Sequence, residues 1–108
     1  MHIYDLYGFL SSDLDQVKDA LETCLDIRFV PHEGSFRGEY YLHEHPNNEE
    51  RLSLQMNVDP EDGEPLYREF AQFPIILHVN DTNRSEGLAK LLQGTVTDCE
   101  LLRHKVVP

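Results

Sequence analysis

The clearest pattern of hydrophobic and polar positions in this chain lies between Arg51 and Val58. Apolar and polar residues alternate there without interruption, and the apolar positions are Leu52, Leu54, Met56 and Val58. Successive side chains of a β-strand point to opposite faces of a sheet, so this alternation predicts a strand with one buried and one water-facing side. Such a strand is typical of an antiparallel sheet that has one open face.

Apolar residues three and four positions apart predict an amphipathic helix over Asp13–Leu25. The apolar stripe of this helix consists of Leu14, Val17, Leu21, Cys24 and Leu25. Asp13 or Ser12 has the side chain that an N-cap requires.

A second amphipathic helix is expected over Arg84–Gln93, because Leu88, Leu91 and Leu92 recur at helical spacing. Asn83 with Glu86 three residues later resembles a capping pair. Gly94 suits the position just after the end of a helix.

Segments rich in β-branched and aromatic residues predict five further strands: Ile3–Leu10, Ile27–His32, Phe36–His43, Pro74–Asn80 and Val96–Val107. Gly8 indicates a bulge or a close approach of another group to the backbone, and Pro31 indicates an edge strand or the end of one. The run Pro74–Asn80 is almost continuously apolar, which is typical of a central strand covered on both faces. Leu66–Phe73 is expected to form a short helical turn or a packed loop.

These elements predict a single α+β domain over residues 1–108, with the order β-α-β-β-β-β-α-β. We expect a mostly antiparallel sheet of about six strands with both helices on one face. The short turn between the second and third strands predicts a hairpin. A ferredoxin-like core with one added hairpin satisfies this order.

Net charge is distributed unevenly along the sequence. Residues 1–70 contain sixteen of the twenty carboxylates and account for the whole net charge of −11, whereas residues 71–108 are neutral. A field of this kind repels phosphate and anionic lipid and attracts basic surfaces. With only nine Lys and Arg residues in all, nucleic-acid binding is disfavoured, and a basic protein partner is favoured.

The remaining composition predicts a cytoplasmic protein that does not enter a membrane. The sequence contains no apolar run of the roughly 20 residues that span a bilayer and no recognisable secretory signal. Cys24 and Cys99 are expected to be free thiols, with a single disulfide as the alternative.

His43, His45 and Glu49 form the strongest candidate for metal chemistry. Residues two apart on a strand share a face, so the two imidazoles could bind one ion with Glu49 as a third ligand. The set also resembles the first metal motif of cupins, although no second motif follows. A small metal-dependent enzyme is therefore an alternative, whereas two exposed histidines in a polar loop are the interpretation we prefer, with no cofactor.

Other catalytic chemistry has little support in the sequence. No Ser occurs in a Gly-x-Ser-x-Gly elbow, and no Gly-rich phosphate loop is present. Cys24 belongs to the apolar stripe of the first helix, and His78 lies within a buried run. We therefore expect a protein that is not an enzyme.

The chain as a whole resembles the small immunity proteins of bacterial contact-dependent growth inhibition and polymorphic toxin systems. The resemblance rests on Ile3–Leu10, the helix Asp13–Leu25, and the strand Pro74–Asn80 followed by a capped helix. It implies a non-enzymatic inhibitor that binds a cognate toxin domain, often a nuclease with a basic active site. No functional residue is carried over from these families.

Charge alone selects the candidate partner-binding residues. They are Glu49, Glu50, Asp59, Glu61, Asp62 and Glu64, with Tyr67 as a possible anchor. They fall in two acidic loops on either side of the strand Arg51–Val58, so the loops are expected at opposite ends of it, roughly 20–25 Å apart. An inhibitor that mimics DNA is a further alternative, and it requires carboxylates spaced along one face like phosphates.

Overall fold

The computed structural model describes residues 2–34, 38–96 and 98–108. Within them the chain forms two α-helices and six strands in the predicted order. The elements are β1 (His2–Phe9), α1 (Leu14–Leu25), β2 (Val30–Gly34), β3 (Gly38–Glu44), β4 (Arg51–Met56), the 3₁₀ turn η1 (Arg68–Phe70), β5 (Ile75–Thr82), α2 (Ser85–Thr95) and β6 (Cys99–Val107). The predicted α+β class is therefore confirmed.

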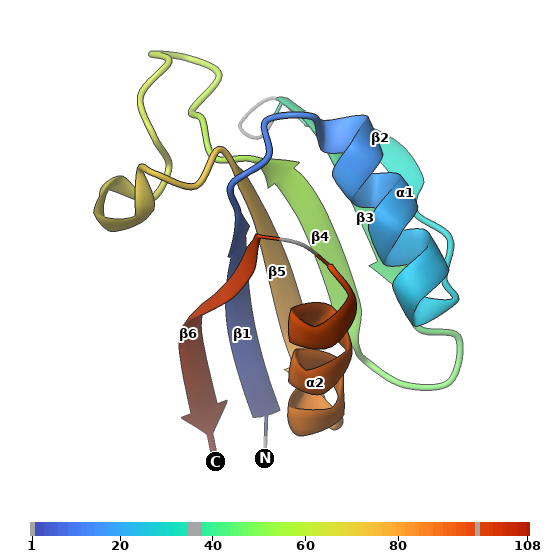
Figure 1. Cartoon of the computed structure of the whole chain (residues 1–108). Helices are drawn as coiled ribbons and strands as arrows, with labels where there is room; N and C mark the ends of the chain where they lie inside the picture. Colours follow the sequence, from blue (N-terminus) through green and yellow to red (C-terminus); the bar gives the residue numbers. More distant parts are fainter. Residues whose placement is uncertain (1, 35–37, 97) are drawn as a thin grey trace.

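All six strands belong to one antiparallel sheet with the order β2-β3-β4-β5-β1-β6. Both helices cover the same face of this sheet (Figure 1). Without β2 and β3, the chain order is β-α-β-β-α-β, which is that of a ferredoxin-like unit. The β2–β3 hairpin extends this unit beyond β4, so β2 with Pro31 is an edge strand, as predicted.

The main core lies between the helices and the sheet. Alternate residues of the four central strands meet the apolar stripes of α1 and α2, and the fully buried members include Tyr7, Leu21, Leu54, Leu77, Leu88 and Leu92. β5 lies between β4 and β1, and Ile75, Ile76, Leu77 and Val79 are all buried. The prediction of a central strand covered on both faces is confirmed.

The two helices begin differently. Asp13 caps α1, with its carboxylate accepting a hydrogen bond from the Gln16 amide at 3.1 Å, as the sequence predicts. The predicted cap of α2 is wrong, because Arg84 occupies the N-cap position and makes no side-chain capping bond. Gly94 lies inside α2 rather than after it, because the helix continues to Thr95.

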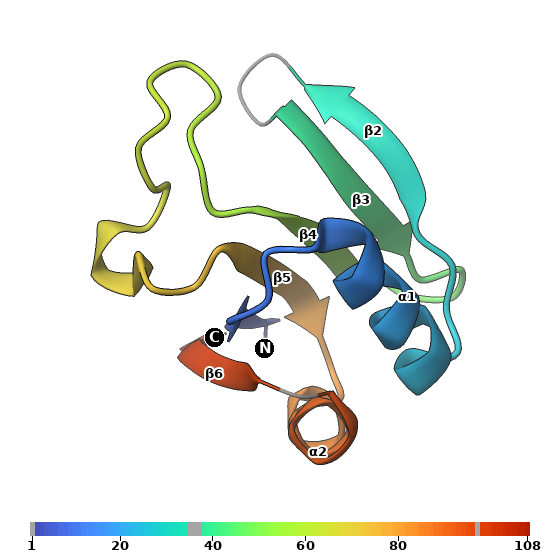
Figure 2. The same ribbon diagram turned by 45° about the horizontal axis from the view of Figure 1, so that its top comes forward.

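The prediction that one side of the strand Arg51–Val58 faces water is also wrong. Ser53 and Gln55 point away from the helices, yet they are only 4% and 2% exposed. Residues 66–73, here called the strap, cross this second face and carry η1 (Figure 2). Leu66 and Tyr67 of the strap line one pocket together with Ser53 and Gln55. This polar strand face is therefore next to a segment that lies ten and more residues further along the chain.

Apolar contacts hold the strap against the second face. Phe73 of the strap is buried, as are Leu6 and Ile76, and none of the three belongs to the main core cluster. Gly8 lies directly beneath the strap, and a Cβ atom at this position would come within 2.6 Å of Cγ of Phe73. The predicted close approach at Gly8 is thus confirmed.

Several strand boundaries differ from those predicted. β2 begins at Val30 rather than Ile27 and runs through Gly34, which the sequence assigns to a turn. β4 ends at Met56, before Val58. Residues 35–37, where the predicted strand Phe36–His43 begins, and residue 97 of the predicted strand Val96–Val107 lie outside the described residues.

Candidate functional site

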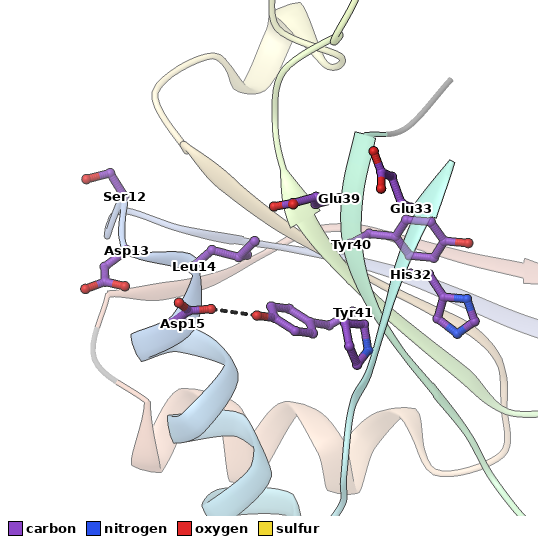
Figure 3. Close-up of a pocket in the computed structure, with 10 residues that line it drawn as sticks. Ser12, Asp13, Leu14, Asp15, His32, Glu33, Glu39, Tyr40 and Tyr41 are labelled. Atoms are coloured by element: carbon purple, nitrogen blue, oxygen red, sulfur yellow. Dashed lines mark hydrogen bonds between the residues drawn. The ribbon is translucent and has the colours of Figure 1, made fainter. Parts of the chain in front are cut away.

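A groove of about 760 Å³ separates the first turn of α1 from the β2–β3 hairpin (Figure 3). Its walls carry four carboxylates and two tyrosines: Asp13, Asp15, Glu33, Glu39, Tyr40 and Tyr41. All four acidic residues are exposed. The groove is therefore a negatively charged recess with aromatic walls.

The position of each acidic side chain in the groove follows from local structure. Asp13 is the cap of α1, and Asp15 lies in its first turn, where a negative charge suits the helix dipole. The Tyr41 hydroxyl donates to Asp15 Oδ1 at 2.6 Å across the groove. This hydrogen bond raises the pKa of Tyr41 above its ordinary value, and it fixes the distance between helix and hairpin.

Glu33 and Glu39 are direct cross-strand partners in the β2–β3 hairpin. Like charges placed opposite each other in an antiparallel pair destabilise it. Among the residues that the structure describes, neither carboxylate has a Lys or Arg partner within ion-pair distance. Within the described part of the hairpin, these two negative charges therefore have no ion-pair partner.

The predicted acidic loop adjoins this hairpin. A Cβ atom at Gly38, the first residue of β3, would lie 3.7 Å from Cβ of Pro60, and Figures 1 and 2 show the loop at the end of the molecule where β2 ends and β3 begins. Asp59 and Asp62 shape the loop by accepting hydrogen bonds from the amides of Glu61 and Glu64.

Eight carboxylates thus gather at one end of the molecule, here called the acidic end. They are Asp13, Asp15, Glu33, Glu39, Asp59, Glu61, Asp62 and Glu64, and all but Asp59 are exposed. Within the described part of the chain, none of them forms an ion pair. Sequence reasoning found the loop but missed the other four, because the hairpin and the helix cap join the loop only in three dimensions.

The predicted partner-binding residues do not lie together in the structure. The two loops lie at opposite ends of β4 (Figure 1), so Glu49 is remote from the acidic end. Glu50 is not on the surface, because its side chain is fully buried against Arg84. Burial opposes ionisation of Glu50, but hydrogen bonds from Arg84 and Thr82 outweigh it and hold its pKa below the usual range.

Tyr67 belongs to the strap rather than to the acidic end. Its hydroxyl oxygen lies 2.8 Å from Nε2 of His78, and the Arg103 guanidinium lies over its ring at 5.6 Å. Arg103 also pairs with Glu69 at 2.9 Å. Tyr67 therefore holds the strap on the sheet, and its role as a partner anchor stays a prediction.

The predicted metal set is not brought together. His43 Nδ1 lies 3.0 Å from the Arg28 carbonyl oxygen, and His45 Nδ1 accepts a hydrogen bond from the Asn47 amide. Glu49 instead lies beside His2 and Asp81. Among the described residues, His43 and His45 belong to no group of three potential metal ligands.

Asp5, Ser85 and His104 form the arrangement closest to a catalytic triad. Nδ1 of His104 lies 2.6 Å from Asp5 Oδ1, but the Ser85 hydroxyl donates to the other oxygen of Asp5 at 2.5 Å. A triad needs the serine on the second imidazole nitrogen, whereas Ser85 lies on the Nδ1 side, at 3.4 Å. Ser85 and His104 therefore provide hydrogen-bond partners for the buried carboxylate of Asp5. The arrangement does not activate Ser85 as a nucleophile.

Neither cysteine is arranged for nucleophilic chemistry. Both are free thiols. Burial raises the pKa of Cys99 to about 12, and reactive thiols require a lowered one. Cys24 packs against the core and its Sγ lies 3.5 Å from the carbonyl oxygen of Leu91.

No protein-family model matches the chain, and the search of curated proteins returned no match. No helix among the described residues is long and apolar enough to cross a membrane.

Proposed function

We propose that this chain is a non-enzymatic protein-binding inhibitor whose acidic end docks on a basic surface of its partner. One observation carries the proposal: Glu33 and Glu39 face each other across β2–β3 beside six further carboxylates, without a compensating cation among the described residues. Folding holds these charges close at a cost. A Lys- or Arg-rich surface would relieve that repulsion on binding.

The groove suits a single basic side chain within such a surface. Two carboxylates from the helix and two from the hairpin can accept the donors of an arginine or lysine. Tyr41 lines the same recess and Lys18 Nζ lies 5.4 Å from the centre of its ring, so this wall already holds one cation over an aromatic face. The acidic loop then extends the contact beyond the groove through Asp59, Glu61, Asp62 and Glu64. This extent supports a broad partner rather than a small cation.

The class of partner follows from the resemblance and the charge together. Immunity proteins of contact-dependent growth inhibition systems neutralise toxin domains, and a nuclease toxin has the basic active site that this surface would attract. The carboxylates are grouped at one end instead of being spaced along one face, which favours this function over mimicry of DNA.

Binding kinetics test the proposal. The chain is used as bait in a pull-down from its source organism, and its association with a basic protein recovered there is followed by surface plasmon resonance at several salt concentrations. The double variant Glu33→Lys with Glu39→Lys should associate at least about tenfold more slowly at low salt and show a flatter salt dependence, because charges at a binding surface act mainly on the association rate.

A matched control makes the same change in net charge elsewhere. Glu86 on α2 and Glu100 on β6 are exposed and lie away from the β2 edge of the sheet. Changing both to Lys should alter association less than about threefold, through the long-range field only. If both double variants weaken binding equally, or neither does, the acidic end is not the binding surface.

A further inference from the structure

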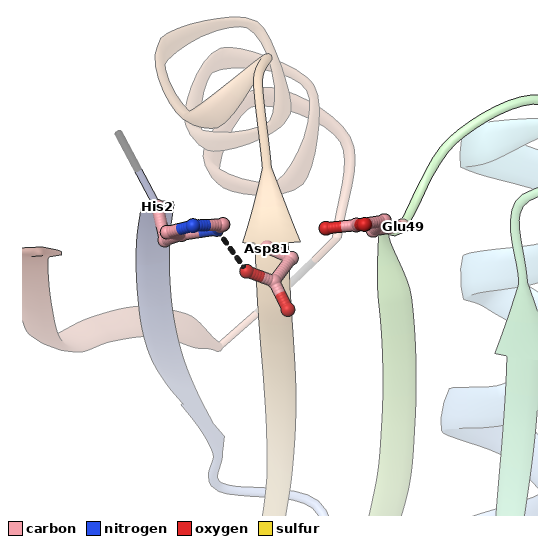
Figure 4. A group of neighbouring side chains, drawn as sticks. All are labelled: His2, Glu49 and Asp81. Carbon is pink, nitrogen blue, oxygen red and sulfur yellow. Dashed lines mark hydrogen bonds and ion pairs between the residues drawn. The ribbon is translucent and has the colours of Figure 1, made fainter. Parts of the chain in front are cut away.

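His2, Glu49 and Asp81 come together at the end of the sheet opposite the acidic end (Figure 4). His2 is the first residue of β1, Glu49 lies in the loop before β4, and Asp81 is near the end of β5. Three segments that are distant in the sequence therefore supply one side chain each. One potential ligand atom from each residue lies within 4.8 Å of the other two. Asp81 occupies the middle, with His2 Nδ1 at 2.6 Å from its Oδ1.

A bulge in β5 directs Asp81 to this position. Ile3 pairs with Thr82 and Asp5 with Val79, so β5 has one more residue than β1 over this interval. Asp81 takes up the extra length with a φ of +54°, a left-handed conformation that few non-glycine residues adopt. Bulges of this kind re-aim side chains, and this one turns Asp81 toward Tyr4 and His2.

A second contact fixes the orientation of Asp81. The Tyr4 hydroxyl donates to Asp81 Oδ1 at 3.1 Å. Hydrogen bonds from neighbouring groups to a ligating carboxylate are a usual feature of metal centres, because they hold the ligand in place before the ion arrives. Asp81 therefore has both a constrained backbone and a tethered side chain.

The donor set points to a divalent ion of the zinc type. One imidazole and two carboxylates are ligands that zinc and its first-row neighbours accept, with water in the remaining position. A tetrahedral Zn²⁺ at about 2.0–2.2 Å from each ligand places the ligand atoms roughly 3.4 Å apart. The three ligand atoms lie within 4.8 Å of one another, and an ion between them would replace the direct contact of His2 Nδ1 with Asp81 Oδ1, which is 2.6 Å.

We propose that His2, Glu49 and Asp81 bind one zinc-type divalent ion, which ties the start of β1 to the end of β5 and to the loop before β4. The site is exposed on two of its three residues, so an ion and its water can enter from solvent. It also shares no residue with the acidic end. Metal binding here is therefore independent of partner binding at the acidic end.

The test is calorimetric titration of Zn²⁺ into protein purified without a polyhistidine tag. We expect one ion per chain, and the absorption spectrum with Co²⁺ should show a bound, non-aqueous ion. His2→Ala and Asp81→Asn should each weaken zinc binding at least about tenfold. Tyr4→Phe should weaken it less, because Tyr4 acts through Asp81.

The control variants are His43→Ala and His45→Ala, which remove the histidines of the sequence-predicted set. They should bind Zn²⁺ like the unaltered protein. Retention of one-to-one binding in His2→Ala, loss of binding in the His43 or His45 variants, or no saturable binding by the unaltered protein would each overturn the inference. His2 is exposed, so far-ultraviolet circular dichroism of His2→Ala should confirm an unchanged fold.

Discussion

Glu50 and Arg84 form a bidentate ion pair, buried on the Glu50 side, that joins the loop before β4 to the start of α2. Arg84 Nη2 lies 2.6 Å from Glu50 Oε1, and Nε lies 2.9 Å from Oε2. Thr82 donates to the same carboxylate at 2.8 Å. The Glu50 side chain is fully buried, whereas 38% of the Arg84 side chain remains exposed.

Removing Arg84 should be more harmful than neutralising Glu50. Arg84→Ala leaves the buried carboxylate without its guanidinium partner, although Thr82 still donates to it, and such a change costs about 3–5 kcal/mol of unfolding free energy. Glu50→Gln leaves a guanidinium that water already reaches, so we expect a loss of about 1–2 kcal/mol. Urea denaturation followed by circular dichroism measures both, since the chain has no tryptophan.

The double variant completes the cycle. Glu50→Gln with Arg84→Ala should be more stable than Arg84→Ala alone, because the buried negative charge is gone. Strictly additive losses would show that the two side chains do not act as a pair.

Asn57 is expected to determine whether the strap stays on the sheet. Its side-chain amide donates to the carbonyl oxygens of Phe70 and Phe73, and its oxygen accepts from the Tyr67 amide. Asn57 is 3% exposed. Asn57→Ala should therefore lower the unfolding free energy by about 2–4 kcal/mol, through three lost bonds and the backbone groups left unpaired.

Hydrogen exchange locates the effect, and Asn83→Ala is its control. In Asn57→Ala, protection should fall first in residues 66–73. Asn83 is exposed and does not cap α2, so its replacement should change stability by less than about 0.5 kcal/mol. A large loss of unfolding free energy in Asn83→Ala would show that Asn83 does cap α2, as the sequence predicts.

Two glycines should respond to alanine in opposite directions. At Gly8 a methyl group would meet Phe73 Cγ at 2.6 Å and Leu102 Cδ1 at 2.7 Å. Because the strap would have to move, Gly8→Ala should cost about 1–3 kcal/mol of unfolding free energy.

Gly87 lies in α2, and a Cβ there meets nothing within 4 Å. Gly87→Ala should raise the unfolding free energy by about 0.5–1 kcal/mol, since alanine loses less backbone entropy in a helix. Equal effects at the two positions, measured by urea denaturation, would contradict the close packing of the strap over Gly8.

Tyr7 makes stability depend on alkaline pH. Its side chain is fully buried, and burial raises its pKa from 10.0 to about 12. Between these values the unfolded chain loses the proton before the folded one, so stability falls as pH rises, by up to about 1.4 kcal/mol per pH unit. Tyr7→Phe should remove the contribution of Tyr7 to this fall, whereas Tyr4 and Tyr41, whose pKa values are also raised, keep theirs.

The same variant should not be destabilised at pH 7. The Tyr7 hydroxyl has no hydrogen-bond partner among the described residues, so its removal is expected to be neutral or to add about 1 kcal/mol of unfolding free energy.

Cys99, whose pKa is raised from 9.0 to about 12, causes a separate fall in stability that begins near pH 9. Cys99→Ala should remove that earlier fall, and urea denaturation from pH 7 to 11 distinguishes the two.

The sequence by itself determined the elements of this protein and their order. Helix and strand periodicity is local, so Leu14–Leu25 and the strands around Gly8, Leu54 and Leu77 could be predicted from neighbours a few residues away. The net charge of −11 and its acidic loop were equally visible. Boundaries of β2 and the start of α2 were missed, because hydrogen bonding across the sheet and packing override local capping preferences there.

Only the tertiary structure decided which polar residues are dry and which acidic residues act together. Ser53 and Gln55 have the pattern of a wet face, but they are buried beside the strap, and a polar residue with partners is as stable inside as in water. Glu50 is buried because Arg84 reaches it from another element. Chain folding likewise places Gly38 of the hairpin beside Pro60 of the acidic loop, and such long-range contacts leave no local period in the sequence.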